Sequence, residues 1–444
     1  MENLVFYTDT LINREIAFIL NIPYVYINKL TKKEIKNRKV FITNNEDKKV
    51  LIKKGLKQKE DFITFKELYD YFDQFNREYE LVNRNDKKFK HTIDEVNKLN
   101  PEELSLSEML VKVLYSKPKD IDCKIIEEQA NIDFNGDLWG CCPTWICKPF
   151  GNILLDDDMY NNYYARMIKL SSLNKTFCFC NLNMCKYYDR KHLKKFETNF
   201  EIREYPEQLT ISTDKTCNLR CNSCRKCFYK PSEEEKKITH LITEKLVDSG
   251  WLNECCILIA GQGEVFFSKE YIKMLKSAIN GKAIKILSNG ILFTEDKWNI
   301  IEKRFKEIYV AISIDAATKE TYQKLRHGNF EVLLKNLQML SQRRKENKIW
   351  SFQFNYVVQK ENYKEMIDFV KLAKKLNVDV VQFTKLNDWF TTTQEEYKEN
   401  CLIIDDYLNY DLYKIFQDPI FKDSIVNIES FEELIENSKK HYLK

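Results

Sequence analysis

The sequence predicts an α/β protein whose largest part is a partial (β/α)6 barrel, joined to a small cysteine-rich module and an N-terminal α/β module. Between residues 205 and 390, short apolar strands alternate with amphipathic helices. Thirteen of the fourteen cysteines lie between Cys123 and Cys256. Apolar residues make up 43% of the chain, which is enough for a globular core.

A chain of 444 residues has room for about three domains at roughly 150 residues each. We predict three modules and a tail: an α/β module of unknown role at 1–115, a cysteine-rich module at 116–200, the barrel at 205–390 and a helical tail at 391–444. In the first module we expect strands at Leu4–Tyr7, Tyr24–Ile27 and Val40–Thr43. No glycine-rich turn follows these strands, which argues against a dinucleotide site there.

The barrel is predicted from six strand segments and the amphipathic stretches between them. The strands are Leu209–Thr213, Ile257–Ala260, Ala283–Leu287, Ile308–Ile314, Phe352–Val358 and Val378–Phe383. The helical stretches include Glu233–Val247, Lys269–Ala278, Phe330–Leu340 and Lys364–Leu376. Strand–helix alternation implies parallel strands with right-handed crossovers. The chemistry of such barrels lies at the C-terminal ends of the strands.

Charge and hydropathy exclude two classes of partner. The 71 basic and 67 acidic residues leave a net charge of +4, which provides no basic footprint for nucleic acid. No apolar run approaches the ~18 residues of a membrane span. The N-terminal segment carries charged and polar residues that a secretory signal lacks. We therefore expect a cytoplasmic protein, whose reducing surroundings leave thiolates free to bind iron.

A compact cysteine motif follows the first barrel strand. The run TDKTCNLRCNSCRKC places Cys217, Cys221 and Cys224 at CxxxCxxC spacing. Three thiolates on one loop can hold three irons of a 4Fe–4S cubane and leave the fourth iron open to a small molecule. The alternatives are a closed four-cysteine cluster that uses Cys227 and a zinc loop, although zinc loops favour CxxC pairs.

This loop and three later motifs resemble the radical S-adenosylmethionine (SAM) superfamily, whose barrel is TIM-like. The later motifs are IAGQGEVFFS, LSNG and AISIDAATKETYQKLR, each at the end of a predicted strand. The resemblance implies SAM contacts at Gly263, Glu264, Ser288, Asn289, Ser313, Asp315 and Arg326, with Arg326 at the SAM carboxylate. The sequence departs from the family at Gln262 and Val265, and at Ser223, where the family has an aromatic residue that packs on adenine. Phe228 and Tyr229 are candidate substitutes.

The resemblance also implies a reaction. One electron enters the cluster, SAM is cleaved to methionine and a 5′-deoxyadenosyl radical, and that radical abstracts hydrogen from a substrate. The electron donor would be a protein such as flavodoxin or ferredoxin. Cys227 has no ligand role in the three-cysteine reading, so it is a candidate hydrogen-atom donor to a substrate radical.

The seven cysteines upstream of the barrel resemble a SPASM domain, a module that holds an auxiliary 4Fe–4S cluster in many radical SAM enzymes. Relatives more often carry it after the barrel, whereas here it precedes the barrel. The resemblance implies ligands at Cys123, Cys142, Cys180 and Cys185, with Cys141 as the alternative to Cys142 and Cys178 as the alternative to Cys180. A structural zinc site and buried free thiols are the competing interpretations.

The predicted function is therefore that of a two-cluster enzyme of oxidoreductase type. SPASM relatives often act on peptides, so a peptide or protein is the first expected substrate. A carbohydrate or another small metabolite, undergoing dehydrogenation or epimerisation, is the main alternative. A third hypothesis is a non-catalytic iron–sulfur or zinc scaffold.

Overall fold

The structure is a computed structural model of the whole chain. It describes residues 4–7, 13, 17, 26–27, 39–41, 45–57, 62–63, single positions between 98 and 123, 125–155, 158–173, 175–185, 203–225, 227–259, 263–388 and 393–443. The chain divides into two compact units. Unit 1 comprises Met1–Asn131 and Asp137–Pro206, and unit 2 comprises Ile132–Gly136 and Glu207–Lys444. The finer division into four parts remains a prediction.

Unit 1 begins with a small parallel sheet in the order β2-β1-β3-β4. Its elements are β1 (Leu4–Tyr7), β2 (Tyr26–Ile27), β3 (Lys39–Phe41), α2 (Asn45–Lys53) and β4 (Phe62–Ile63). Val5, Val40, Leu51, Leu56 and Phe62 form its buried core. The described parts of the three predicted strands are confirmed as β1, β2 and β3, and Val5 of β1 and Val40 of β3 pack with Leu51 of α2.

The cysteine-bearing part of unit 1 has little regular structure. Its elements are α6 (Ile125–Glu128), β5 (Gln129–Ile132), β6 (Asp137–Trp139), β7 (Gly151–Asn152) and α7 (Tyr163–Leu173). β6 and β7 pair antiparallel. The Tyr160 hydroxyl donates to the Glu127 carbonyl at 2.5 Å, and the Ser172 hydroxyl donates to the Cys123 carbonyl at 2.7 Å. These two bonds join the segment around α6 to α7 and to the residues just before α7.

Unit 2 contains seven parallel strands in the order β16-β13-β12-β11-β10-β9-β8. They are β8 (Gln208–Ile211), β9 (Cys256–Ile259), β10 (Gly281–Ser288), β11 (Phe305–Ser313), β12 (Ser351–Val358), β13 (Val380–Lys385) and β16 (Val426–Asn427). All six predicted barrel strands are confirmed, and the order of neighbours follows the chain. The architecture is an α/β partial barrel.

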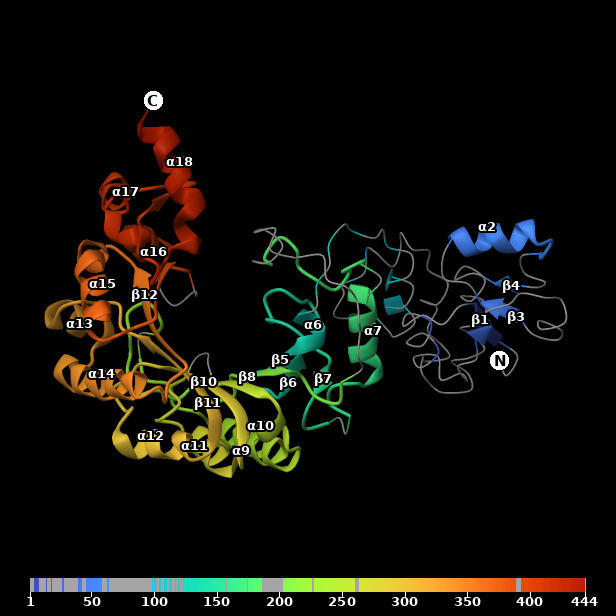
Figure 1. Cartoon of the computed structure of the whole chain (residues 1–444), viewed down its shortest axis with the longest axis horizontal. Helices are drawn as coiled ribbons and strands as arrows, with labels where there is room; N and C mark the ends of the chain where they lie inside the picture. The colour runs from blue at the N-terminus through green and yellow to red at the C-terminus, as the bar shows by residue number, and fades with distance from the viewer. Residues whose placement is uncertain are drawn as a thin grey trace. The chain divides into compact units, whose positions relative to one another are not determined.

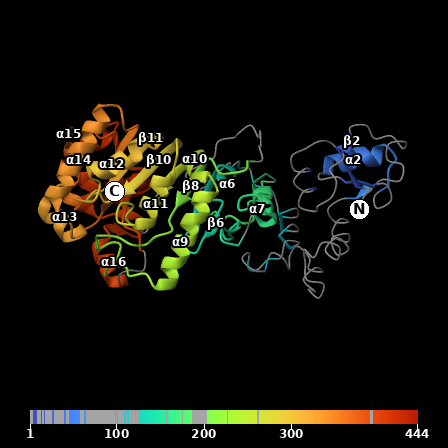
Figure 2. The same ribbon diagram turned by 90° about the horizontal axis from the view of Figure 1, so that it is seen from below.

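Helices connect the strands and cover their outer face. They are α9 (Glu233–Asp248), α10 (Trp251–Glu254), α11 (Lys269–Ser277), α12 (Glu295–Glu302), α13 (Lys319–Arg326), α14 (Phe330–Lys345), η3 (Tyr363–Glu365) and α15 (Met366–Lys375). α11 and α12 lie below the strands in Figure 1 and overlap them in the view from below in Figure 2. A capping box of Ser232 and Glu235 begins α9 and satisfies amides of its first turn. Among the helices that the structure describes, none is long and apolar enough to cross a bilayer.

The C-terminal tail belongs to unit 2. Its elements are α16 (Gln394–Asn400), β14 (Ile403–Ile404), β15 (Tyr407–Leu408), α17 (Tyr410–Ile415), η4 (Pro419–Lys422), β16, η5 (Glu429–Phe431) and α18 (Glu432–Tyr442). The prediction of helices and loops for this tail is wrong at three two-residue strands. β14 and β15 pair with each other, and β16 joins the large sheet. That strand has two residues, too few for an alternating pattern, and it forms by pairing with β13.

Candidate functional site

The predicted SAM-contact residues and the cysteine loop lie at or after the C-terminal ends of four neighbouring strands, with the loop after β8 and the SAM-contact residues after β9, β10 and β11. Ser288 ends β10 and pairs in register with Ile312 of β11, while Ser313 ends β11 and pairs with Asn355 of β12. The strands are parallel, so their C-terminal ends meet at this edge. The cysteine loop follows β8, and Gly263 follows β9. The fold therefore brings the four sequence motifs together.

The loop that carries Cys217, Cys221 and Cys224 begins at Asp214. The Asp214 carboxylate accepts hydrogen bonds from the Thr216 amide at 2.8 Å and from the Ser268 hydroxyl at 2.6 Å. Cys221 is buried, Cys217 is half-buried and Cys224 is exposed. The three thiols thus lie on a loop whose start is held by hydrogen bonds. Their solvent exposure increases from Cys221 through Cys217 to Cys224.

Nitrogen donors face two of the three sulfur atoms. The Leu219 amide lies 3.4 Å from Cys217 Sγ, and Asn289 Nδ2 lies 3.8 Å from the same sulfur. Arg326 Nη1 lies 3.7 Å from Cys221 Sγ. Burial raises the pKa of the Cys217 thiol to about 11, and the Leu219 amide opposes that rise. Such donors stabilise a thiolate, which is the form that binds iron.

Gly263 lies where the chain after β9 crosses the cysteine loop. A Cβ atom at this position would stand 2.2 Å from the Asp214 carbonyl oxygen and 3.0 Å from that of Thr216. The next amide, Glu264 N, donates to the Thr216 carbonyl at 2.8 Å. The close approach of two backbones requires glycine here. The family resemblance implies a SAM contact at Gly263, and the close approach of the two backbones is a second reason for glycine at this position.

The buried Glu264 carboxylate joins the end of β9 to the turn after β10. It accepts hydrogen bonds from Ser288 Oγ at 2.7 Å and from the Asn289 amide at 2.8 Å. Burial raises the pKa of Glu264, and these donors oppose the rise. Asn289 Nδ2 also donates to Asn218 Oδ1 at 2.9 Å. Glu264, Ser288 and Asn289 therefore form one hydrogen-bonded group against the cysteine loop.

Asp315 and Arg326 form a buried ion pair beside Cys221. Arg326 Nη2 lies 2.7 Å from Asp315 Oδ2, with the two side chains 11% and 2% exposed. Asp315 has a φ of 63° and accepts a hydrogen bond from the Val357 amide at 2.7 Å. Burial disfavours the charge of Arg326, but Asp315 and Cys221 outweigh burial and raise the pKa of Arg326. The guanidinium is therefore held in its charged form.

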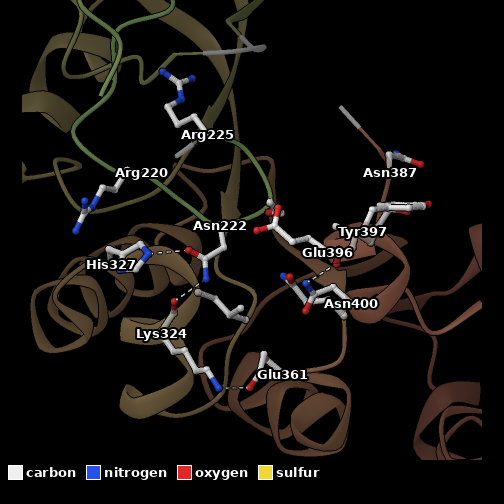
Figure 3. A pocket seen from close by; sticks show the side chains of 14 residues that line it. Arg220, Asn222, Arg225, Lys324, His327, Glu361, Asn387, Glu396, Tyr397 and Asn400 are labelled. Carbon is white, nitrogen blue, oxygen red and sulfur yellow. Dashed lines mark hydrogen bonds and ion pairs between the residues drawn. The ribbon is translucent and has the colours of Figure 1, made fainter. Parts of the chain in front are cut away.

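A hollow of about 420 Å³ adjoins the cysteine loop within unit 2 (Figure 3). Its lining is mostly polar and comes from the loop, α13, the segments after β12 and β13, and α16: Arg220, Asn222, Ser223, Arg225, Lys324, Leu325, His327, Gln359, Glu361, Leu386, Asn387, Glu396, Tyr397 and Asn400. Figure 3 shows the Asn222–His327 contact at 2.7 Å and the Lys324–Glu361 ion pair. Apart from Ser223, the sequence analysis assigned none of these residues to the site. Arg220, Asn222, Arg225, Lys324 and Leu325 lie within its motifs without an assigned role, and the remaining lining residues lie in no motif.

Three residues discussed with the loop are not part of this lining. Cys227 is exposed, and its role as hydrogen donor remains a prediction. Phe228 is 51% exposed, and the Tyr229 hydroxyl donates to Glu235. An aromatic side chain does line the hollow, because Tyr397 of α16 lies there together with Ser223.

Of the other departures from the family pattern, Gln262 lies outside the described residues.

In unit 1, four half-buried cysteines from three segments of the chain line one cavity. They are Cys123, Cys141, Cys180 and Cys185, and the other lining residues are Ile121, Ile125, Ile126, Trp145, Ser172, Phe177 and Leu182. Burial raises the pKa of Cys123 to about 11 and that of Cys141 to about 12. Charges on neighbouring cysteines add to the rise in each case, which indicates mutual proximity.

The remaining unit 1 cysteines face elsewhere. Cys142 Sγ lies 3.2 Å from Thr144 Oγ1, and Cys147 Sγ donates to the Phe179 carbonyl at 3.1 Å. Thr176 Oγ1 donates to Cys178 Sγ at 3.9 Å. The geometry thus favours Cys141 over Cys142 and Cys180 over Cys178, two choices that the sequence left open.

Within the described ranges, no three Cys, His, Asp or Glu side chains converge on one metal-ion position. Cubane ligands bind different irons, so they stand farther apart than the ligands of one ion. The three loop thiols, with nitrogen donors facing two of the sulfurs, fit a 4Fe–4S cluster that has one iron free.

Residues 211–373 match the family model described as the radical SAM superfamily. The chain therefore carries a radical SAM domain in unit 2, which implies a 4Fe–4S cluster and SAM as its cofactors. No curated protein matches the chain.

Solved structures with similar folds include Streptococcus suis SuiB bound to its precursor peptide SuiA and native anSMEcpe with bound AdoMet and a peptide. SuiB is 16% identical over 64% of this chain and 58% of its own, with a TM-score of 0.38. For anSMEcpe the identity is 16% over 52% and 62%, with a TM-score of 0.34. This chain thus spans less than two thirds of either protein.

Proposed function

We propose that this radical SAM enzyme abstracts hydrogen from a peptide or protein and that unit 1 holds an auxiliary 4Fe–4S cluster that serves the substrate reaction. The observation that carries the cluster is the gathering of Cys123, Cys141, Cys180 and Cys185 around one apolar cavity. Four buried thiolates would repel one another strongly, and a cationic iron core compensates that charge. With four protein ligands the cluster would have no open iron, which suits electron transfer.

The hollow beside the cysteine loop supports a peptide substrate. Four amide side chains line it, those of Asn222, Gln359, Asn387 and Asn400. The Asn222 amide is bonded to Lys324 and His327 and the Asn400 amide donates to Glu396, so the side-chain amides of Gln359 and Asn387 are the ones that would offer a donor and an acceptor to a peptide group. Asn222 and Ser223 lie between Cys221 and Cys224, so a ligand in the hollow would lie beside the cluster loop.

The chain's own residues position the reactants. Cys217, Cys221 and Cys224 would hold the cluster, and Gly263 allows the backbone after β9 to approach the loop. Glu264 holds the Ser288–Asn289 turn against that loop. When bound, the cluster and SAM supply the reductive cleavage that generates the radical. The protein then orients the substrate and excludes water from the radical.

The substrate class can be tested with isotope transfer. Lysate from cells grown in deuterated water is filtered to separate large from small molecules, and half of each fraction is digested with a protease that is then inactivated. Each fraction is incubated with the reconstituted enzyme, SAM and a strong reductant. We expect deuterium in 5′-deoxyadenosine from undigested peptide or protein and a loss of that transfer after digestion.

The same experiment separates the alternatives. Transfer that resists digestion and passes the small-molecule filter would assign the enzyme to a carbohydrate or another metabolite. The absence of any 5′-deoxyadenosine from a fully iron-loaded chain would favour the scaffold hypothesis.

A further inference from the structure

Arg326 contacts both a buried carboxylate and a cluster-loop sulfur. Its Nη2 pairs with Asp315 at 2.7 Å, while its Nη1 lies 3.7 Å from Cys221 Sγ. The side chain is 11% exposed. Cys221 is the buried member of the three loop cysteines, so this contact is shielded from water. A hydrogen bond in such surroundings has a larger electrostatic effect than one at the surface.

The fold fixes the guanidinium relative to the sulfur from both sides. Arg326 ends α13, and His327 closes that helix with a φ of 56°. The loop is bonded to the same helix end, because the Asn222 amide donates to the Leu325 carbonyl at 2.9 Å and Asn222 Nδ2 donates to the Lys324 carbonyl at 3.1 Å. These bonds hold the backbone of the cysteine loop against the end of α13, and the ion pair with Asp315 holds the guanidinium.

We propose that Arg326 raises the reduction potential of the loop cluster by donating a hydrogen bond to the sulfur of Cys221. Reduction adds one negative charge to the cluster, and donors to the ligand sulfurs stabilise the more negative state. Asp315 offsets most of the charge of Arg326, so the hydrogen bond to Cys221 should change the reduction potential more than the net charge of Arg326 does. Arg326 is thus a positioning residue toward the cluster, a role separate from the predicted contact with SAM. The proposal rests on the cluster assigned to Cys217, Cys221 and Cys224.

The test is an anaerobic redox titration of the full chain without SAM, followed by the electron paramagnetic resonance of the reduced cluster. Arg326→Ala and Arg326→Lys are compared with the wild type. Lys324→Ala is the matched control, because it removes a cation two residues away whose side chain is 61% exposed and paired with Glu361. A chain with the three loop cysteines replaced supplies the spectrum of any other cluster for subtraction.

We expect Arg326→Ala to lower the ratio of reduced to oxidised loop cluster about tenfold at a fixed potential, which is about 59 mV for one electron. Arg326→Lys should recover part of this change, and Lys324→Ala should match the wild type. An unchanged ratio in Arg326→Ala with full iron content would overturn the proposal.

A further variant is needed if Arg326→Ala fails to bind iron. If Arg326→Ala does not bind iron, Arg326→Gln replaces it in the titration, and iron loss in both variants would assign Arg326 to cluster assembly and overturn the proposal. If the wild type itself lacks a signal that depends on the loop cysteines, the proposed function fails, an outcome distinct from an unchanged potential.

Discussion

The two groups of cysteines differ in how the chain brings them together. In unit 2, Cys217, Cys221 and Cys224 lie on one loop, and nitrogen donors face two of their sulfurs. In unit 1, the four gathered cysteines come from three segments, with Cys180 and Cys185 on the same one, and they line a cavity with mostly apolar walls. The first arrangement would leave one iron of a cluster open for chemistry, whereas the second would supply a ligand to every iron of a cluster. We therefore propose that the loop carries SAM cleavage and that the unit 1 group has a supporting role.

The largest effect should follow removal of the loop ligands. Replacing Cys217, Cys221 and Cys224 with Ala should reduce 5′-deoxyadenosine formation to the uncatalysed background, because no thiolate is left to hold the reactive cluster. Iron should fall from about eight to about four per chain, the number in one cubane. An unchanged yield of 5′-deoxyadenosine in this variant would refute the assignment of SAM cleavage to the loop.

Replacing Cys180 and Cys185 with Ala tests the proposed role of the unit 1 cysteines in the substrate reaction. Formation of 5′-deoxyadenosine without product should persist, while product formation from the true substrate should cease. Metal binding can supply folding energy, so the variant must first show native-like circular dichroism and about four remaining irons. A folded variant that turns over its substrate at the wild-type rate would leave unit 1 a structural role only.

Substitutions at the neighbouring Cys141 and Cys142 test which of the two binds iron in unit 1. Cys141→Ser should lower the unit 1 iron content, whereas Cys142→Ser should retain it, because Cys141 lines the cavity and Cys142 faces Thr144. Iron and sulfide are counted in both variants within the loop-cysteine triple variant, where all bound iron belongs to unit 1. The reverse result would restore Cys142 as the ligand.

Gly263→Ala should weaken SAM binding about tenfold to a hundredfold, which corresponds to about 1.4–2.7 kcal/mol. The added Cβ would stand 2.2 Å from a backbone carbonyl oxygen of the cysteine loop and force the loop to shift. Gly281→Ala is the control, since its Cβ would meet mainly the Phe305 ring at the other end of β10. Calorimetry should show weaker SAM binding only for Gly263→Ala, and equal affinities in the two variants would contradict this account.

The comparison also shows how far the sequence predicts the site. The loop cysteines were predicted because their spacing is local, and the barrel strands were predicted because each has an apolar pattern long enough to recognise. The choice between Cys141 and Cys142 depends on which side chain of two neighbours turns inward, and spacing carries no such information. The residues of the hollow, such as Gln359 and Tyr397, come from distant segments that only the folded sheet brings together.

The smallest expected effect concerns the pH dependence of stability. Burial raises the pKa of Glu264 in the folded chain, so the native state retains that proton to higher pH than the unfolded chain does. The free energy of unfolding should therefore fall as pH rises from the unfolded pKa of about 4.3 through the raised native pKa. Glu264→Gln removes this titration. Urea unfolding of the iron-free chain at several pH values should show the variant losing less stability than the wild type across that window; parallel curves would contradict the buried-carboxyl argument.

The most direct test of the central claim is the reaction of the wild-type chain with SAM. The anaerobically reconstituted protein is incubated with SAM and a strong reductant, and methionine and 5′-deoxyadenosine are quantified together. The account predicts that both form in equal amounts and only when reductant is present. A chain that binds its full complement of iron and leaves SAM intact under these conditions would contradict it.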